Sequence, residues 1–230
     1  MTSFNPNLQI GQEISNAELV SIFKCGNMGG MRRSHATNTL VLVSDYTKGL
    51  YHDKWIGGTL HYTGMGKVGD QDLHWAQNDT LAGCRTNGVD VHLFVVMNEG
   101  VYTYCGRIEL VDKPYQEIQP DENGHDRLVW MFPIRPVPEN NVKKPSAFVF
   151  TDWDDYRTNG KAKEAAYNAE HVKSAKKSSG KVAQKVRHKK FGEGVVMETK
   201  GEFIVVNFST AGKKQLNLKV CLDKGLFFFV

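Results

Sequence analysis

The sequence lacks the features that would place a protein in a membrane or in an oxidising compartment. No run of 18 apolar residues occurs, so we expect no membrane-spanning helix. The first ten residues contain no basic stretch followed by an apolar one, so no secretory signal is expected. Cys25, Cys84, Cys105 and Cys221 form no C-x-x-C pair, which argues against a zinc knuckle or a disulfide scaffold. We therefore expect a cytoplasmic protein with reduced thiols.

The sequence also lacks a recognisable catalytic centre. The eight histidines are dispersed, whereas an HNH nuclease needs clustered histidines to hold a metal. Glu198-Thr199-Lys200 matches only the E-x-K half of a PD-(D/E)xK nuclease, and three-residue patterns recur freely by chance. The G-x-S-x-G, H-E-x-x-H and G-K-[ST] motifs are absent. We predict no catalytic residue, no metal site and no cofactor, so the chain is expected to bind rather than to cut.

Charge is distributed unevenly along the chain. Eleven Lys or Arg residues and two acids lie between Arg157 and Lys190, so this segment carries +9 and the remainder of the chain carries −5 of the total of +4. A basic segment joined to a slightly acidic body is typical of contact with phosphates, and it is equally typical of a solvated linker. Charge alone leaves both interpretations open.

Residues 1–151 have the pattern of a strand-dominated α+β domain. Short runs rich in β-branched and aromatic residues predict strands, and near-continuous apolar runs such as VHLFVV indicate strands buried on both faces. Ser15 followed three residues later by Glu18 predicts a capped helix start, and a second helix is expected over 72–85. This mixture favours a curved sheet or barrel with flanking helices. The predicted strands are Thr39–Val43, Thr59–Tyr62, Val89–Val96, Tyr102–Leu110 and Leu128–Pro133.

Two further segments follow. Residues 152–183 have helix-forming composition and then change to Lys-Lys-Ser-Ser-Gly, which predicts a short exposed basic helix and a flexible linker. In residues 184–230 the hydrophobic pattern changes again, and it predicts three or four strands with turns at 192–194, 200–201 and 211–212. Fewer than fifty residues of strand and tight turn favour a small SH3-like barrel.

The stretch from Gly29 to Leu73 combines residue types that suit recognition of a nucleobase. A strand leads into a loop with Tyr46, Tyr51, Asp53 and Trp55, and a second strand delivers Tyr62 into a glycine-rich turn. Aromatic rings offer planar faces for a base, a carboxylate accepts from the amino group of cytosine, and glycines allow a close approach of backbone. Taken as a pattern alone, the same aromatics also fit an ordinary hydrophobic cluster beneath a long loop.

The motif His61-Tyr62-Thr63-Gly64-Met65-Gly66 resembles the Y-T-G motif of the SRA (YDG) family of modified-cytosine readers. The resemblance extends from Gly29 to Pro136 and is greatest to the SRA-like domains of bacterial methylation-dependent HNH restriction enzymes. It implies an SRA/PUA-like curved β-barrel and a pocket for a flipped base. One pocket aromatic would be Tyr62, and the aspartate nine residues earlier would be Asp53. The other aromatic position falls on Leu50, so Tyr51 or Tyr46 would supply the second face.

The resemblance also suggests which cations hold DNA. Positively charged and polar residues near the motif would bind the phosphates on either side of the extruded nucleotide. Each of them could instead be an exposed loop residue without a partner. The predicted phosphate contacts are Arg32, Arg33, Ser34, Lys48, Lys54 and Lys67.

The segment from Val186 to Val196 resembles the Tudor-like C-terminal module of UvrD/PcrA-type DNA helicases through its V-x-H-x-x-F-G-x-G-x-V motif. In that group the module binds protein partners, RNA polymerase among them. Gly192 and Gly194 are expected to permit a tight turn between strands. The resemblance implies a protein partner for this module, such as RNA polymerase, and a nuclease is a second candidate. The lysines of the module, Lys189, Lys190, Lys213 and Lys214, could contact either protein or phosphate.

We therefore predict a non-catalytic, nucleoid-associated reader of 5-methylcytosine or 5-hydroxymethylcytosine in double-stranded DNA. Such a reader would act by base flipping, in restriction or defence. Two alternatives remain open. The first is an adaptor that recruits transcription or repair machinery through the C-terminal barrel. The second is a reader of modified RNA, because PUA-like folds related to SRA also bind RNA.

Overall fold

The computed structural model describes residues 4–47, 52–178, 185–200, 203–217, 220–221 and 226–229. The chain divides into two compact units, Met1–Ala169 and Glu170–Val230. No helix among the described residues is long and apolar enough to cross a membrane. The elements of the first unit are β1 (Glu13–Ile14), α1 (Asn16–Phe23), β2 (Met31–Ser34), β3 (Thr39–Asp45), β4 (Lys54–Ile56), β5 (Thr59–Thr63), α2 (Gln77–Ala82), β6 (Asp90–Asn98), β7 (Val101–Leu110), β8 (Tyr115–Pro120), β9 (Asp126–Val137), η1 (Ser146–Phe148), β10 (Val149–Phe150) and the start of α3 (Trp153–Ser178).

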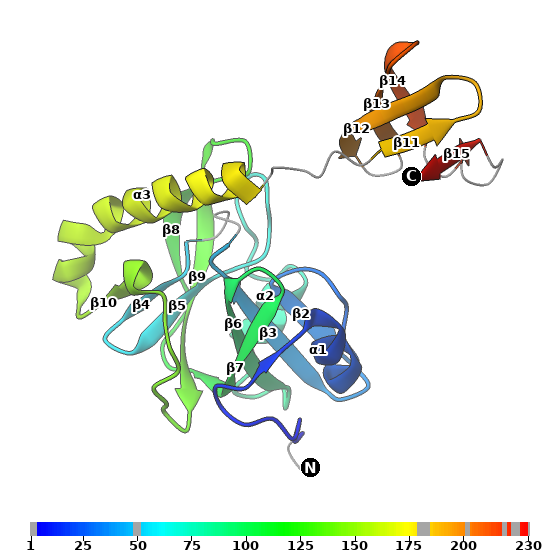
Figure 1. Ribbon diagram of the computed structural model, residues 1–230. Coiled ribbons are helices and arrows are strands. Elements are labelled where there is room, and N and C mark those ends of the chain that lie inside the picture. The colour runs from blue at the N-terminus through cyan, green and yellow to red at the C-terminus, as the bar shows by residue number, and fades with distance from the viewer. Residues whose placement is uncertain are drawn as a thin grey trace. The chain divides into compact units, whose positions relative to one another are not determined.

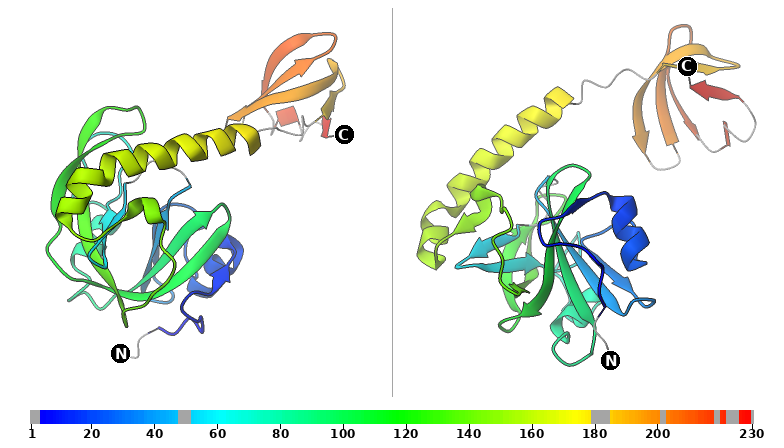
Figure 2. Two further views of the ribbon diagram at one scale, coloured as in Figure 1. Left: turned by 60° about the vertical axis from the view of Figure 1, so that its left-hand side comes forward. Right: turned by 60° about the horizontal axis from the view of Figure 1, so that its bottom comes forward.

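The first unit is built on one strongly curved ten-stranded sheet. Its strands follow the order β10-β4-β5-β9-β7-β6-β3-β2, while β1 pairs with β7 and β8 pairs with β9. Met31 on the edge strand β2 and Phe148, which precedes the opposite edge strand β10, belong to the same buried cluster. The sheet therefore curves until both of its edges face one core, as Figures 1 and 2 show. The predicted strand-dominated α+β class with a curved sheet is confirmed.

The central strands are buried on both faces, as their apolar runs predict. Leu40 and Leu42 of β3 point into the core enclosed by the sheet, whereas Val41 and Val43 point into a second cluster. That second cluster also contains Phe23 of α1, so α1 covers the outer face of these strands (Figure 1). Successive side chains of a strand alternate between faces, which explains how one apolar run serves two cores.

The two predicted helices of this unit differ in outcome. Ser15 caps α1 through a complete capping box with Glu18, as predicted. The helix expected over 72–85 is wrong in extent, because α2 covers only Gln77–Ala82. Ala76 has a positive φ of 52° at its start, and the Asn78 side chain donates to the carbonyl of Asp72. These contacts hold the preceding residues in a loop.

The helix α3 is longer than the short helix that composition predicted. It extends for 26 residues, from Trp153 to Ser178. Asp152 caps its start, because its Oδ1 accepts from the backbone N–H groups of Asp154 and Asp155, both at 2.9 Å. The flexible linker predicted to begin at the Lys-Lys-Ser-Ser-Gly stretch is wrong at its start, because residues 176–178 belong to α3, and its remainder, 179–183, lies outside the described residues.

The second unit contains a five-stranded sheet rather than the expected three or four strands. Its order is β14-β13-β12-β11-β15, formed by β14 (Gly212–Asn217), β13 (Phe203–Phe208), β12 (Gly192–Lys200), β11 (Lys185–His188) and β15 (Phe227–Phe229).

Gly192 and Gly194, the two glycines of the motif in this unit, are required for different structural reasons. Gly192 has a positive φ of 75°, as a residue at a turn can require. The prediction that Gly194 belongs to the same turn is wrong, because Gly194 pairs with Phe208 inside the sheet. A Cβ at this position would lie 2.7 Å from Cδ1 of Phe208 and 2.7 Å from Cγ1 of Val206. Close packing, not turn geometry, therefore requires glycine at Gly194.

Candidate functional site

Asp53 lies where three strands of the first unit converge. It directly precedes β4, and only 4% of its surface is exposed. Its Oδ1 accepts from the backbone N–H of Thr63, which ends β5, at 2.7 Å. Its Oδ2 accepts from the hydroxyl of Ser44 on β3, also at 2.7 Å. The carboxylate is thus held in a fixed orientation by two neutral donors, and each oxygen keeps a lone pair for a further donor.

The protein environment tunes the charge of Asp53. Burial raises its pKa from 3.8 to about 6, although the bonds from Thr63 and Ser44 oppose this rise. The neighbouring Lys54 does not neutralise it through a direct ion pair, because the Lys54 ammonium bonds to the carboxylate of Glu117. At neutral pH Asp53 is therefore mostly an ionised, buried acceptor, and a ligand with an exocyclic amino group matches it.

Tyr62 lies beside Asp53 and is fixed from both ends. Its ring belongs to the core enclosed by the sheet, and 3% of the residue is exposed. Its hydroxyl donates to the carbonyl of Gly30 at 2.7 Å. A Cβ at Gly30 would come within 2.8 Å of that hydroxyl, so the loop before β2 needs glycine there. The nine-residue spacing from Asp53 to Tyr62 thus reflects two paired strands: β4 starts directly after Asp53, and β5 ends directly after Tyr62.

The other predicted pocket residues are placed differently. Tyr46 is buried, with its ring 4.9 Å from that of Phe148. Trp55 is 1% exposed and packs in the core, with the Lys144 ammonium 4.1 Å from the ring centre. Trp55 lies on the same inward face as Asp53, because the two residues are two positions apart in extended chain, and like Tyr62 and Tyr46 it is buried in the core as placed. Tyr51 lies outside the described residues.

The predicted phosphate contacts separate into buried and exposed side chains. Arg32 is 5% exposed and donates to the carbonyl of Gly29 and to Asn16. Ser34 is 1% exposed and donates to the carbonyl of Lys24. As placed, both side chains support the loop before β2 and are not available to phosphate. Burial with internal partners, which a single sequence does not reveal, is the reason.

The remaining cations of that set also differ from one another. Arg33 bonds to the carbonyl of Thr39 and to the side chain of Asn38 within its own hairpin. Lys54 is 2% exposed and engaged with Glu117, so it too is unavailable as placed. The side chain of Lys67 is 67% exposed and lies 3.9 Å from Glu122. Lys48 lies outside the described residues. Lys67 therefore remains the best placed of the described predicted contacts for a phosphate.

Three exposed apolar side chains on the two glycine-rich loops were missed by the sequence reasoning. Met28 is 81% exposed and lies two residues before Gly30, whose carbonyl holds Tyr62. Val68 and Trp75, 58% and 52% exposed, lie on the loop that follows Thr63. Met28 and Val68 stand beside glycines in the stretches CGNMGG and GMGKVG, which is a signal that could have indicated them, whereas Trp75 lies in neither stretch. Such side chains are suited to insertion between stacked bases.

The loop after Thr63 is held by buried polar side chains. Asn78 is fully buried, and its Oδ1 accepts from the backbone N–H of Met65 at 2.7 Å. Gln71 donates to the carbonyl of Gly64 at 2.7 Å, and Arg127 donates to the carbonyl of Gly66 at 2.6 Å. This bracing explains the segment Gln77–Leu81, whose asparagine shapes the loop beside the motif. The apolar tips of this loop are therefore presented by an ordered backbone.

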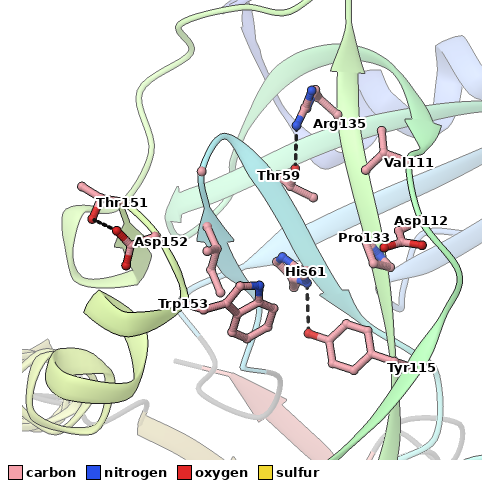
Figure 3. A pocket seen from close by; sticks show the side chains of 12 residues that line it. Thr59, His61, Val111, Asp112, Tyr115, Pro133, Arg135, Thr151, Asp152 and Trp153 are labelled. Carbon is pink, nitrogen blue, oxygen red and sulfur yellow. Dashed lines mark hydrogen bonds between the residues drawn. The ribbon is translucent and has the colours of Figure 1, made fainter.

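His61 faces away from Tyr62, into a pocket of about 710 Å³ on the other side of β5. Its Nδ1 is 2.9 Å from the hydroxyl of Tyr115, and the ring of Trp153 packs edge-to-face on His61 with ring centres 4.9 Å apart, so that the three side chains lie together in Figure 3. Burial lowers the pKa of His61 to about 4, so the ring is neutral at physiological pH. His61 therefore does not belong to the Asp53 site. Among the described residues, no group of three His, Cys, Asp or Glu side chains is arranged to hold a metal ion.

Solved structures with similar folds include complexes of other proteins with modified DNA. The sulfur-binding and SRA domains of ScoMcrA, complexed with phosphorothioated DNA, are 19% identical, with a TM-score of 0.49 over 64% of this chain and 48% of that one. The SUVH5 SRA domain, in complex with hemimethylated CG DNA, is 20% identical, with a TM-score of 0.46 over 63% and 99%. KRYPTONITE, in complex with mCHG DNA and SAH, is 18% identical, with a TM-score of 0.45 over 60% and 34%.

The matched region thus spans about half of the ScoMcrA chain and about a third of the KRYPTONITE chain. No curated protein matches this chain. The family model described as "ScoMcrA-like, SRA domain" matches residues 10–155, which include every strand of the first unit and the Asp53 site. By that match, the chain belongs to the ScoMcrA-like SRA domain family.

Proposed function

We propose that this protein is a non-catalytic reader of modified cytosine in DNA, which it binds by extruding the base toward Asp53. The observation that carries the proposal is the buried carboxylate of Asp53, oriented by Thr63 and Ser44 and ionised at neutral pH. An acceptor in this position suits the N4 amino group of cytosine and disfavours thymine, which presents O4, an acceptor, at the same place. Membership of the SRA family supports the proposal, as do the modified-DNA complexes of the similar structures.

Extrusion of a base costs free energy, which contacts from the loop before β2 and from the residues around Asp53 would have to offset. Unstacking and unpairing a nucleotide costs a few kcal/mol. Stacking on aromatic faces returns about 1–3 kcal/mol per base. We assign Tyr62 to that role, together with Tyr46 or Tyr51. Met28, exposed on the loop that contacts Tyr62, would fill the space that the extruded base leaves in the duplex.

The test compares duplexes that carry cytosine, 5-methylcytosine or 5-hydroxymethylcytosine at one position, with matched RNA as the control, at a fixed salt concentration. Full-length protein should bind a modified DNA duplex most tightly. Asp53→Asn replaces one acceptor with a donor and should reduce that preference by about 1–3 kcal/mol. Asp126→Asn, the same change at an exposed position on β9, should leave it unchanged.

Base flipping is tested separately by placing 2-aminopurine next to the modified cytosine in the same strand. Extrusion of the cytosine removes a stacking neighbour of the probe, so its fluorescence should rise on binding of the parent protein. Equal affinity for all duplexes would refute the reader function. Preference for the modified duplex without a fluorescence rise would refute flipping alone. Preference for RNA would favour the modified-RNA reader instead.

We further propose that the second unit is a Tudor-like module of the UvrD/PcrA type and recruits a protein, either a nuclease or RNA polymerase. Motif residues that build its sheet support this assignment: Val186 lies in its core, and His188 stacks on Phe191 with ring centres 4.7 Å apart. Purified RNA polymerase titrated with the full chain gives the test. Saturable binding that does not depend on DNA is expected, and its absence would leave a nuclease as the partner to examine.

A further inference from the structure

The helix α3 contacts the chain on both sides of the segment that leads to Asp53. Before this segment, the Tyr167 hydroxyl donates to the carbonyl of Tyr46 at 2.9 Å. After it, the Glu164 carboxylate contacts Nδ1 of His52. The hydroxyl of Tyr156 is 3.0 Å from the Lys54 ammonium, which also lies over the Tyr156 ring. One helix thus contacts Tyr46, His52 and Lys54.

The contacts to His52 and Lys54 lie on the opposite side of the backbone from the Asp53 carboxylate, whereas Tyr167 packs against the core that contains Tyr46 and Tyr62. His52 and Lys54 point to α3, whereas Asp53, between them, points to Ser44 and Thr63. Alternation of this kind is the rule in extended chain. Through His52 and Lys54, the helix therefore supports the outer side of the chain that carries Asp53.

The helix is itself attached firmly enough to act as a support. Its preceding strand β10 pairs in parallel with β4, with Val149 opposite Trp55. Its described inward positions follow a helical stripe and are at least partly buried. The Tyr167 ring packs edge-to-face on Phe148 at 4.9 Å, and Phe148 in turn contacts Tyr46. These inward positions are Tyr156, Gly160, Lys163, Glu164 and Tyr167.

The helix residues that make these contacts lie outside the stretch that the family model matches. That match ends at residue 155, and Tyr156, Glu164 and Tyr167 all follow it. We infer that α3 is a clamp for the modified-base site, in which Tyr167 and Glu164 are positioning residues that hold Tyr46 and His52 so that Asp53 meets the base. The inference rests on the proposed function of the Asp53 site.

The clamp explains a chemical detail of the His52 contact. Burial, with a smaller contribution from Lys54, lowers the pKa of His52, so a neutral ring meets Glu164 at physiological pH. A neutral ring whose Nδ1 carries the proton donates to any acceptor and does not need a negative charge. Glutamine at position 164 should therefore preserve the contact, while alanine removes it.

The experiment measures two quantities in the full chain: the ratio of affinities for modified and unmodified duplexes, and the hydrogen-exchange rate of the Thr63 amide in the free protein. Tyr167→Phe keeps the ring but removes the bond to Tyr46. We expect it to lower the affinity ratio about threefold to tenfold, the usual range for one hydrogen bond. Glu164→Ala should do the same, and Glu164→Gln should restore the parent ratio.

The Thr63 amide reports the clamp independently of DNA, because it donates to Asp53. It should exchange faster in Tyr167→Phe and Glu164→Ala than in the parent. Glu170→Gln, the same chemistry at an exposed position on the same helix, should change neither quantity. The thermal midpoint of each variant shows whether the fold itself has been weakened.

The outcomes separate the two proposals. If the parent binds modified and unmodified duplexes with equal affinity, the reader function is refuted. The exchange rate of the Thr63 amide in the variants then tests the clamp without DNA. A parent that discriminates, with variants unchanged in both ratio and exchange, overturns the clamp. A higher affinity for modified DNA in the variants would also overturn it, because the helix would then be covering the site. If the variants lose the same affinity for both duplexes and have a lower thermal midpoint, the contacts serve only to stabilise the fold. That result would overturn the positioning role.

Discussion

Replacement of Asp53 by asparagine should stabilise the protein at neutral pH while it removes selective binding. The parent carboxylate is 4% exposed, and burial raises its pKa from 3.8 to about 6. Each pKa unit corresponds to about 1.4 kcal/mol. The ionised group therefore costs the native state about 3 kcal/mol above pH 6. An amide of the same shape can still accept from Thr63 and donate to Ser44, and it carries no charge to desolvate.

The sign of this effect depends on pH in a defined window. Below about pH 4 the carboxyl group is protonated in both the folded and the unfolded chain, so the cost is absent. From about pH 4 to pH 6 the unfolded chain loses its proton first, because the folded-state pKa is the higher one. The free energy of unfolding of the parent should therefore fall across this window relative to Asp53→Asn, and the difference should stay constant at higher pH.

Urea unfolding followed by tryptophan fluorescence provides the assay. All four tryptophans, Trp55, Trp75, Trp130 and Trp153, belong to the first unit, so the signal reports the unit that contains Asp53. The midpoint and the slope give the free energy at each pH. A difference between parent and variant that does not change from pH 4 to pH 7.5 would refute the assignment of a buried, charge-destabilised carboxylate. A variant less stable than the parent at pH 7.5 would refute it as well.

Three further predictions follow from other contacts. Selectivity for modified DNA should decline from pH 7.5 to pH 5.5 in the parent, because Asp53 takes up a proton near pH 6. Fluorescence anisotropy at each pH measures this selectivity, and Asp53→Asn should show no such decline. Lys67→Gln should reduce the slope of log affinity against log salt by about 0.9, which titrations at several salt concentrations measure, while an unchanged slope would remove Lys67 from the phosphate contacts. Gly194→Ala should destabilise the second unit by about 1–3 kcal/mol, because its Cβ would overlap Phe208 and Val206, and a thermal melt that matches the parent would contradict this packing argument.

Local patterns in the sequence were sufficient for several features. The capping box of Ser15 and Glu18 predicts the start of α1, because both partners lie within one turn. The apolar runs of β3 and β6 predict burial on both faces, because neighbouring side chains of a strand point in opposite directions. The spacing of Asp53 and Tyr62 pointed to the site through resemblance to a family. In each case the information lies within about ten residues of chain.

What only the tertiary structure decided depends on partners far away in sequence. The sequence presents Arg32, Lys54 and Lys67 as equivalent cations, but the first two are buried against internal acceptors and only Lys67 of the three is exposed. The ion pair of Lys54 joins residues 63 positions apart, and the bond from Tyr167 to Tyr46 spans 121 positions. Curvature of the sheet brings these residues together. Periodicity and spacing describe the neighbours of a residue along the chain, so they determined the elements and the motif but not which charged groups remain free to meet DNA.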